Sequence, residues 1–249
     1  MGLKVRVTLS IFFFQCLLAC LLTGPVVAQT EQDLVRKAIR MAKKNTSSTI
    51  DVRQLIVVFN ESPECNTANL VAIEKKANSW LVAATPIQAG IGRKGFADPG
   101  TKREGDQKSP SGLFELGQLF CYDNNVETKM SYIQSSPDDK WIDDPDSDDY
   151  NRHVRGATEA GSYEKLLLNG NDYRYCMVIE YNTRPVVKGN GSAIFLHLSE
   201  GKSINSSAGC VVLTQNDMER LLKWMDPESN PSILMGTEKK LMDGIKVRD

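Results

Sequence analysis

The stretch "NSSAGCVVLTQNDMERLL", residues 205–222, carries the strongest local signals for the fold of this chain. Cys210 follows a turn of small residues and precedes the apolar triplet "VVL", a pattern that predicts a short buried strand. Thr214 and Asp217 have the spacing of a helix capping box. An apolar stripe at helical spacing follows them: Met218, Leu221, Leu222 and Met225. We therefore expect a short strand that leads directly into a capped helix.

Further strands are predicted in the part of the chain that precedes this stretch. The β-branched run Arg53–Phe59 suits a buried strand, and the clearest apolar runs after it are Tyr173–Asn182 and Ser192–Leu198. Two more strands are expected around "KKANS", and the turn-rich segment 102–117 ends in another. The chain is thus predicted to be mainly β with short helices, an α+β fold.

The N-terminus has the pattern of a secretory signal peptide. Lys4 and Arg6 precede the uncharged apolar run "VTLSIFFFQCLLACLL", and Val26 and Ala28 occupy the −3 and −1 positions of a cleavage site. We predict export to the periplasm or cell envelope, with cleavage after Ala28. Two alternatives stay open: a retained N-terminal anchor, and lipoprotein processing at Cys20.

The chain divides into four predicted segments. They are a signal peptide at 1–28, a helix or tether at 29–50, a main domain at 51–228, which holds the candidate site described below, and a C-terminal tail at 229–249. The composition, 41% hydrophobic and 24% charged, is that of a globular protein. A net charge of −1 gives no basic field for nucleic acid.

The cysteines and histidines limit the kinds of site the chain can form. There is no C-x-x-C motif and no close histidine pair, so we do not predict a zinc site. Export would permit disulfides. If Cys210 stays free, at most one pair forms among Cys65, Cys121 and Cys176, and the sequence does not choose it.

Cys210 and His197 are the candidate catalytic pair. A nearby imidazole can take the proton of a thiol and leave a thiolate nucleophile. A glycine at position 209 would permit a backbone conformation that a Cβ forbids, and the N–H groups of Gly209 and Cys210 could bind an oxyanion. The alternative is an inert core cysteine beside a structural histidine. His153 is an alternative candidate base, but it lies within an acidic segment, where a neighbouring carboxylate is expected to fix it structurally.

Two motifs together resemble those of the YkuD-type L,D-transpeptidase catalytic domain. The pattern "H…S-x-G-C" is formed by His197, Ser207, Gly209 and Cys210, and "SPSGLF" at 109–114 is similar to the family's T-P-x-G-x-F. The resemblance covers roughly residues 53–227. It implies a β-sandwich-like domain with Cys210 as nucleophile and His197 as base, while Ser207 and Gly209 shape the loop and the oxyanion site.

The sequence also departs from the family pattern. Leu198 follows the histidine where Gly or Ser is commoner, and Val212 stands where Arg is frequent, so the peptide recognised is open. A long acidic segment, 121–161, is predicted to be a lid or wall of the substrate site. Its candidate polar lining residues, with those of "KREGD", are Lys102, Arg103, Asp143 and Asp144. The alternative is a structural ion pair between these two segments.

The resemblance implies cysteine-dependent acyl transfer on peptidoglycan stem peptides through a thioester on Cys210. Two alternatives stay open: L,D-carboxypeptidase or amidase-like trimming by the same site, and a catalytically silent envelope-binding domain. The implied chemistry needs neither a metal nor an organic cofactor. No nucleic-acid partner is implied, and the sequence does not give the oligomeric state.

Overall fold

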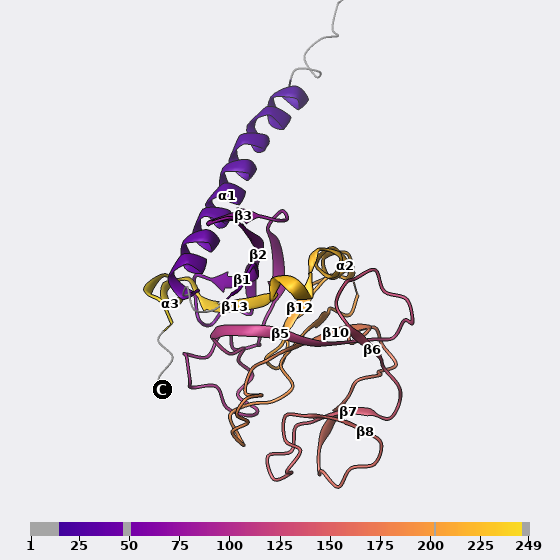
Figure 1. Cartoon of the computed structure of the whole chain (residues 1–249). Coiled ribbons are helices and arrows are strands. Elements are labelled where there is room, and N and C mark those ends of the chain that lie inside the picture. Colours follow the sequence, from indigo (N-terminus) through magenta and orange to yellow (C-terminus); the bar gives the residue numbers. More distant parts are fainter. Residues whose placement is uncertain (1–14, 47–50, 202, 246–249) are drawn as a thin grey trace, which may run out of the picture.

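The structure is a computed structural model that describes residues 15–46, 51–201 and 203–245. In this part of the chain eight strands form a closed barrel (Figure 1). Their order around the barrel is β1 (Gln54–Asn60), β13 (Ser232–Thr237), β5 (Gly112–Cys121), β10 (Tyr175–Ile179), β11 (Phe195–Leu198), β12 (Val211–Leu213), β4 (Ile87–Gly90) and β2 (Thr67–Lys76). β2 pairs with β4 and also with β1, and the second pairing closes the ring. β3 (Ser79–Val82) extends the sheet at β2, and β6 (Tyr132–Gln134) extends it at β5.

The prediction of a mainly β chain with short helices is confirmed, but the expected sandwich-like arrangement is wrong. Closure depends on β13, which pairs in parallel with β1 and antiparallel with β5. β13 belongs to the segment predicted as a C-terminal tail, 229–249, so a domain boundary at residue 228 would cut the barrel. Its six residues lie between charged and polar neighbours that hide the strand pattern in the sequence.

Side chains alternate between the inside of the barrel and its outer face, as the twofold period of a strand requires. Along β1, Ile56 and Val58 point into the main core, to which all eight barrel strands contribute, whereas Leu55, Val57 and Phe59 pack outside against the N-terminal helix. The outer face thus has its own apolar layers, and the functional residues described below stand on this face.

The N-terminal helix α1 (Gln15–Asn45) is longer than the predicted helix or tether at 29–50 (Figure 1). Ala38, Met41 and Ala42 are buried against the barrel, where the short helix α3 (Glu238–Asp243) also packs. The predicted signal peptide lies partly outside the described residues, and residues 15–28 form the first half of α1. Within the described residues, no helix has the length and hydropathy needed to cross a membrane.

The capped helix predicted after the opening stretch is confirmed as α2 (Gln215–Trp224). The hydroxyl of Thr214 accepts a hydrogen bond from the backbone N–H of Asp217 at 3.2 Å. The four residues of the predicted stripe are all buried in the main core: Met218, Leu221, Leu222 and Met225. A single 3-10 turn, η1 (Pro227–Ser229), then leads into β13.

The acidic segment 121–161 is ordered and contributes to a second, three-stranded sheet, β8 (His153–Arg155), β7 (Asp139–Ile142) and β9 (Tyr163–Lys165). The fully buried carboxylate of Asp139 anchors it, accepting hydrogen bonds from Arg155 at 2.8 and 2.9 Å and from Ser136 at 2.7 Å. His153 Nε2 lies 2.7 Å from Asp139 Oδ1, so a carboxylate does fix this histidine. The small sheet lies at the end of the molecule away from α1 (Figure 1).

Candidate active site

Cys210 and His197 stand on neighbouring strands of the barrel. β11 and β12 are parallel, with Leu196 opposite Val211, and Cys210 immediately precedes β12. Leu196 and Val211 point into the barrel core, so the alternation of the strands turns His197 and Cys210 to the outer face. The twelve residues between them, 198–209, include the connection that brings the two strands side by side.

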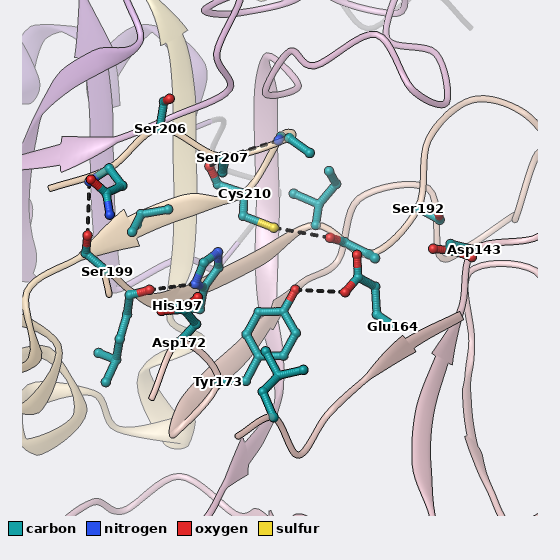
Figure 2. Close-up of a pocket in the computed structure, with 18 of the residues that line it drawn as sticks. Asp143, Glu164, Asp172, Tyr173, Ser192, His197, Ser199, Ser206, Ser207 and Cys210 are labelled. Carbon is teal, nitrogen blue, oxygen red and sulfur yellow. Dashed lines mark hydrogen bonds between the residues drawn. The ribbon is translucent and has the colours of Figure 1, made fainter. Parts of the chain in front are cut away.

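His197 and Cys210 line the same cavity, which has a volume of about 350 Å³. In Figure 2 the imidazole and the sulfur face this cavity from the barrel side. Residues of the small sheet and of the chain that follows it, among them Asp143, Glu164 and Tyr173, line the opposite side. The acidic segment therefore does form part of the wall of the candidate site.

Burial keeps both members of the pair uncharged. Cys210 is 8% exposed, its thiol donates to the Ala193 carbonyl at 3.3 Å, and burial raises the pKa of the thiol to about 12. Burial likewise lowers the pKa of His197 to about 4. The resting pair is thus a thiol and a neutral imidazole, where the sequence led us to expect a thiolate.

The hydrogen bonding of His197 selects its tautomer. Nδ1 lies 2.8 Å from the Leu198 carbonyl oxygen, and because a carbonyl only accepts, Nδ1 carries the proton. The Tyr173 ring packs edge-on against the imidazole, with ring centroids 5.1 Å apart. Nε2 is then unprotonated and able to accept a proton from a thiol.

The loop before Cys210 is held by the hydroxyl of Ser207. This hydroxyl donates to the Cys210 carbonyl at 2.7 Å and accepts the Gly209 N–H at 3.0 Å. The Gly209 N–H is therefore already engaged, which contradicts its expected part in an oxyanion site in this conformation. Gly209 also lacks the positive φ that we expected. It is needed for space, because a Cβ there would lie 3.0 Å from the Lys108 carbonyl oxygen.

The second motif, "SPSGLF", lies directly under this loop. The buried Ser109 hydroxyl donates to the Gly209 carbonyl at 2.7 Å and accepts the Gly92 N–H at 2.9 Å. Two segments a hundred residues apart are thus fastened together beside Cys210. The contact gives a physical reason for the pairing of the two motifs.

Two of the four predicted lining residues reach the cavity and two do not. Lys102 and Asp143 line it, whereas Arg103 and Asp144 do not. Lys102 is 3% exposed, and its Nζ donates to Asp106 Oδ1 at 2.6 Å. Asp144 instead accepts the N–H of Gly161 at 2.7 Å, within its own segment.

The ion pair suggested between "KREGD" and the acidic segment is not among the ion pairs of the described residues. The two segments are linked instead by a hydrogen bond that the Tyr150 hydroxyl donates to the Glu104 carboxylate. The same carboxylate accepts a hydrogen bond from the Ser192 hydroxyl at 2.7 Å. This contact ties the acidic segment to the chain just before β11.

Sequence reasoning missed most of the residues that line the cavity, among them Glu164, Asp172 and Tyr173. The Tyr173 hydroxyl donates to Glu164 Oε2 at 3.3 Å, as Figure 2 shows. None of the three belongs to a motif, and Glu164 reaches the cavity only because β9 pairs with β7. The sequence pattern contains no signal of that pairing.

The four cysteines whose side chains the structure describes form no disulfide, and the described side chains form no metal cluster. Cys65, Cys121, Cys176 and Cys210 are all free thiols. No group of three or more histidine, cysteine, aspartate or glutamate side chains there could hold a metal ion.

Comparison with known proteins gives one family and one similar structure. The family model described as the L,D-transpeptidase catalytic domain matches residues 58–239. No curated protein matches the chain. The chain is similar, with a TM-score of 0.41 and 13% identity, to the crystal structure of the helical cell shape determining protein Pgp2 from Campylobacter jejuni. The alignment covers 82% of this chain and 56% of that one, so this chain spans little more than half the length of that protein.

Proposed function

The chain belongs to the L,D-transpeptidase catalytic domain family, and from this membership we propose that it catalyses acyl transfer on peptidoglycan stem peptides. One observation carries the proposal: Cys210 and His197, on adjacent parallel strands, line a single cavity. A nucleophile and a base that share one cavity meet the basic requirement of covalent acyl transfer.

The reaction follows from the protonation states of the pair. The Cys210 sulfur attacks the carbonyl at the L-centre of the donor's diamino acid while His197 Nε2 takes the thiol proton. Coupling the two events avoids a free thiolate, which burial disfavours. His197 then protonates the departing amine of the terminal D-residue, and a thioester stays on Cys210. An amine of a second stem peptide attacks the thioester, gives its proton to His197 and releases the thiol.

Trimming is the second candidate function, because water in place of the amine makes the same site an L,D-carboxypeptidase. The cavity supports this alternative, since water can enter wherever an acceptor amine can. A silent envelope-binding domain is the third candidate, but such a domain has no chemical need for both His197 and Cys210.

Analysis of muropeptides after incubation with the purified protein separates these candidates. We expect cross-linked products from tetrapeptide donors, and none with Cys210→Ala. Loss of the terminal residue without cross-links would identify the trimming reaction. Cys176→Ala is the matched control, since Cys176 is also a buried thiol on the outer layer but does not line the cavity. An unmodified substrate with the wild-type protein would contradict an enzymatic function.

We also propose that the protein acts in the periplasm or cell envelope, on the strength of the signal pattern in residues 1–28. The intact mass of protein recovered from cells tests this. A chain that begins at Gln29 is expected. A mass equal to that of the full-length chain would indicate a retained anchor. The mass of a chain that begins at Cys20, increased by that of an attached lipid, would indicate a lipoprotein.

A further inference from the structure

The candidate active site carries an excess of negative charge. Five carboxylates line the cavity: Glu104, Asp143, Glu164, Asp172 and Glu200. Among the described lining residues, Lys102 is the one permanent cation, and its ammonium is engaged by Asp106 at 2.6 Å and by the Arg103 carbonyl at 2.8 Å. The cavity therefore favours a ligand that brings a positive charge.

Two of these carboxylates, Asp143 and Glu164, form one wall of the cavity. Asp143 directly follows β7, and Glu164 lies on the paired strand β9, opposite Trp141. Burial raises the pKa of Glu164, and the charge of Asp143 raises it further. The two carboxylates thus lie close enough to repel each other.

One carboxylate oxygen of Asp143 accepts no hydrogen bond from the described residues. This atom, Oδ1, is buried. A buried acceptor without a donor is costly, and the cost is larger for a charged group. Glu164, in contrast, is held by the Tyr173 hydroxyl at 3.3 Å. A cationic donor beside the two carboxylates would relieve the repulsion, and rotation of the Asp143 carboxylate would bring Oδ1 within its reach.

The position of this wall relative to the nucleophile identifies the part of the substrate it meets. In the view of Figure 2, the Cys210 sulfur lies between His197 on one side and Glu164, with Asp143 beyond it, on the other. Because His197 must protonate the departing amine, the leaving D-residue belongs on the His197 side. The retained acyl residue, the diamino acid, then extends toward Glu164 and Asp143.

We propose that Asp143 and Glu164 bind the free ammonium at the distal end of the donor's diamino acid. This inference rests on the proposed function. The ammonium is a recognition group and not the attacking amine, because two carboxylates stabilise its protonated form and a nucleophile must be unprotonated. The site would thus select donors whose distal amine is not yet acylated by a cross-link.

Calorimetric binding to a Cys210→Ala protein tests the proposal without turnover. The probes are two synthetic tetrapeptides that contain the diamino acid, one with a free distal amine and one with that amine acetylated. We expect the free amine to bind about 10- to 100-fold more tightly, the range for a hydrogen bond to a charged group. Adding Asp143→Asn and Glu164→Gln should remove this preference while the acetylated peptide binds as before.

Asp148→Asn is the matched control, because its fully exposed carboxylate pairs with Lys188 at 3.3 Å outside the cavity. It should leave the preference unchanged. Equal binding of the two peptides to the Cys210→Ala protein would overturn the proposal, whether or not the double variant folds. A retained preference without muropeptide turnover by the wild-type protein would instead overturn the proposed reaction and leave the recognition site standing.

Discussion

At the scale of single residues, burial decides the chemistry of the candidate pair. Cys210 lies in an outer apolar layer with Phe195 and Cys176, and the main effect of this layer is to hold the thiol protonated. His197 is held neutral by the same cause. The base therefore retains an unprotonated nitrogen over the whole neutral range, which suits a thiol that loses its proton only during attack.

The raised pKa of Cys210 predicts how its alkylation depends on pH. Below a pKa of about 12 the thiolate fraction grows about tenfold per pH unit, so alkylation should keep rising from pH 6 to 9. Intact mass after iodoacetamide treatment measures this rate, in a Cys65→Ser background that removes the one exposed thiol among the four described cysteines. A plateau below pH 7 would instead indicate a thiolate–imidazolium pair.

At the scale of elements, the loop that precedes Cys210 depends on a distant turn. Ser109 begins the "SPSGLF" turn that leads into β5, and it fastens the Gly209 carbonyl beside β12. Ser111, two residues later, donates instead to the Ala97 carbonyl at 2.6 Å. The two serines are both buried, but only the first contacts the loop that carries Cys210.

Replacing Ser109 by alanine should therefore affect turnover more than stability alone explains. We expect a loss of about 1–3 kcal/mol in the free energy of unfolding, since the Gly92 N–H loses its acceptor. The turnover number should fall by about tenfold or more because Cys210 is less well positioned. Urea unfolding and steady-state kinetics measure both. Ser111→Ala should lose similar stability and keep its turnover number, and equal losses of turnover in both variants would contradict this role.

At the scale of the whole molecule, the C-terminal strand joins the two ends of the sheet. β13 lies between β1 and β5, and Ile233, Leu234 and Met235 are fully buried. Without β13 both neighbouring strands would have open edges, and both the main core and the layer under α1 would lose side chains. The barrel is thus complete only when β13 is in place.

A chain that ends at Asn230 is predicted not to fold. Each lost large apolar side chain costs about 2–5 kcal/mol, so three of them equal the whole stability of a typical domain. Thermal unfolding followed by circular dichroism should show no cooperative transition. A chain that ends at Ile245 keeps β13 and α3 and is the control, which should unfold cooperatively. Cooperative unfolding of the shorter chain would show that β13 is dispensable.

Much of the fold and of the candidate site depends on residues that are close together in the sequence, and these features could be predicted from it. The capping of α2 and the strands before Cys210 depend on neighbouring residues, whose spacing is visible in the chain. The paired motifs around Ser109 and Cys210 predicted the family, and the match over residues 58–239 confirms it.

Contacts between segments that are distant in the sequence were decided only by the tertiary structure. Closure of the barrel by β13, the pairing of β9 with β7 and the arrival of Glu164 in the cavity depend on segments far apart in the chain. The charge state of Cys210 and His197 was also decided there, because burial is a property of the packed molecule and not of the residues in order. The sequence by itself determined which groups could react, and tertiary packing decided their protonation and their neighbours.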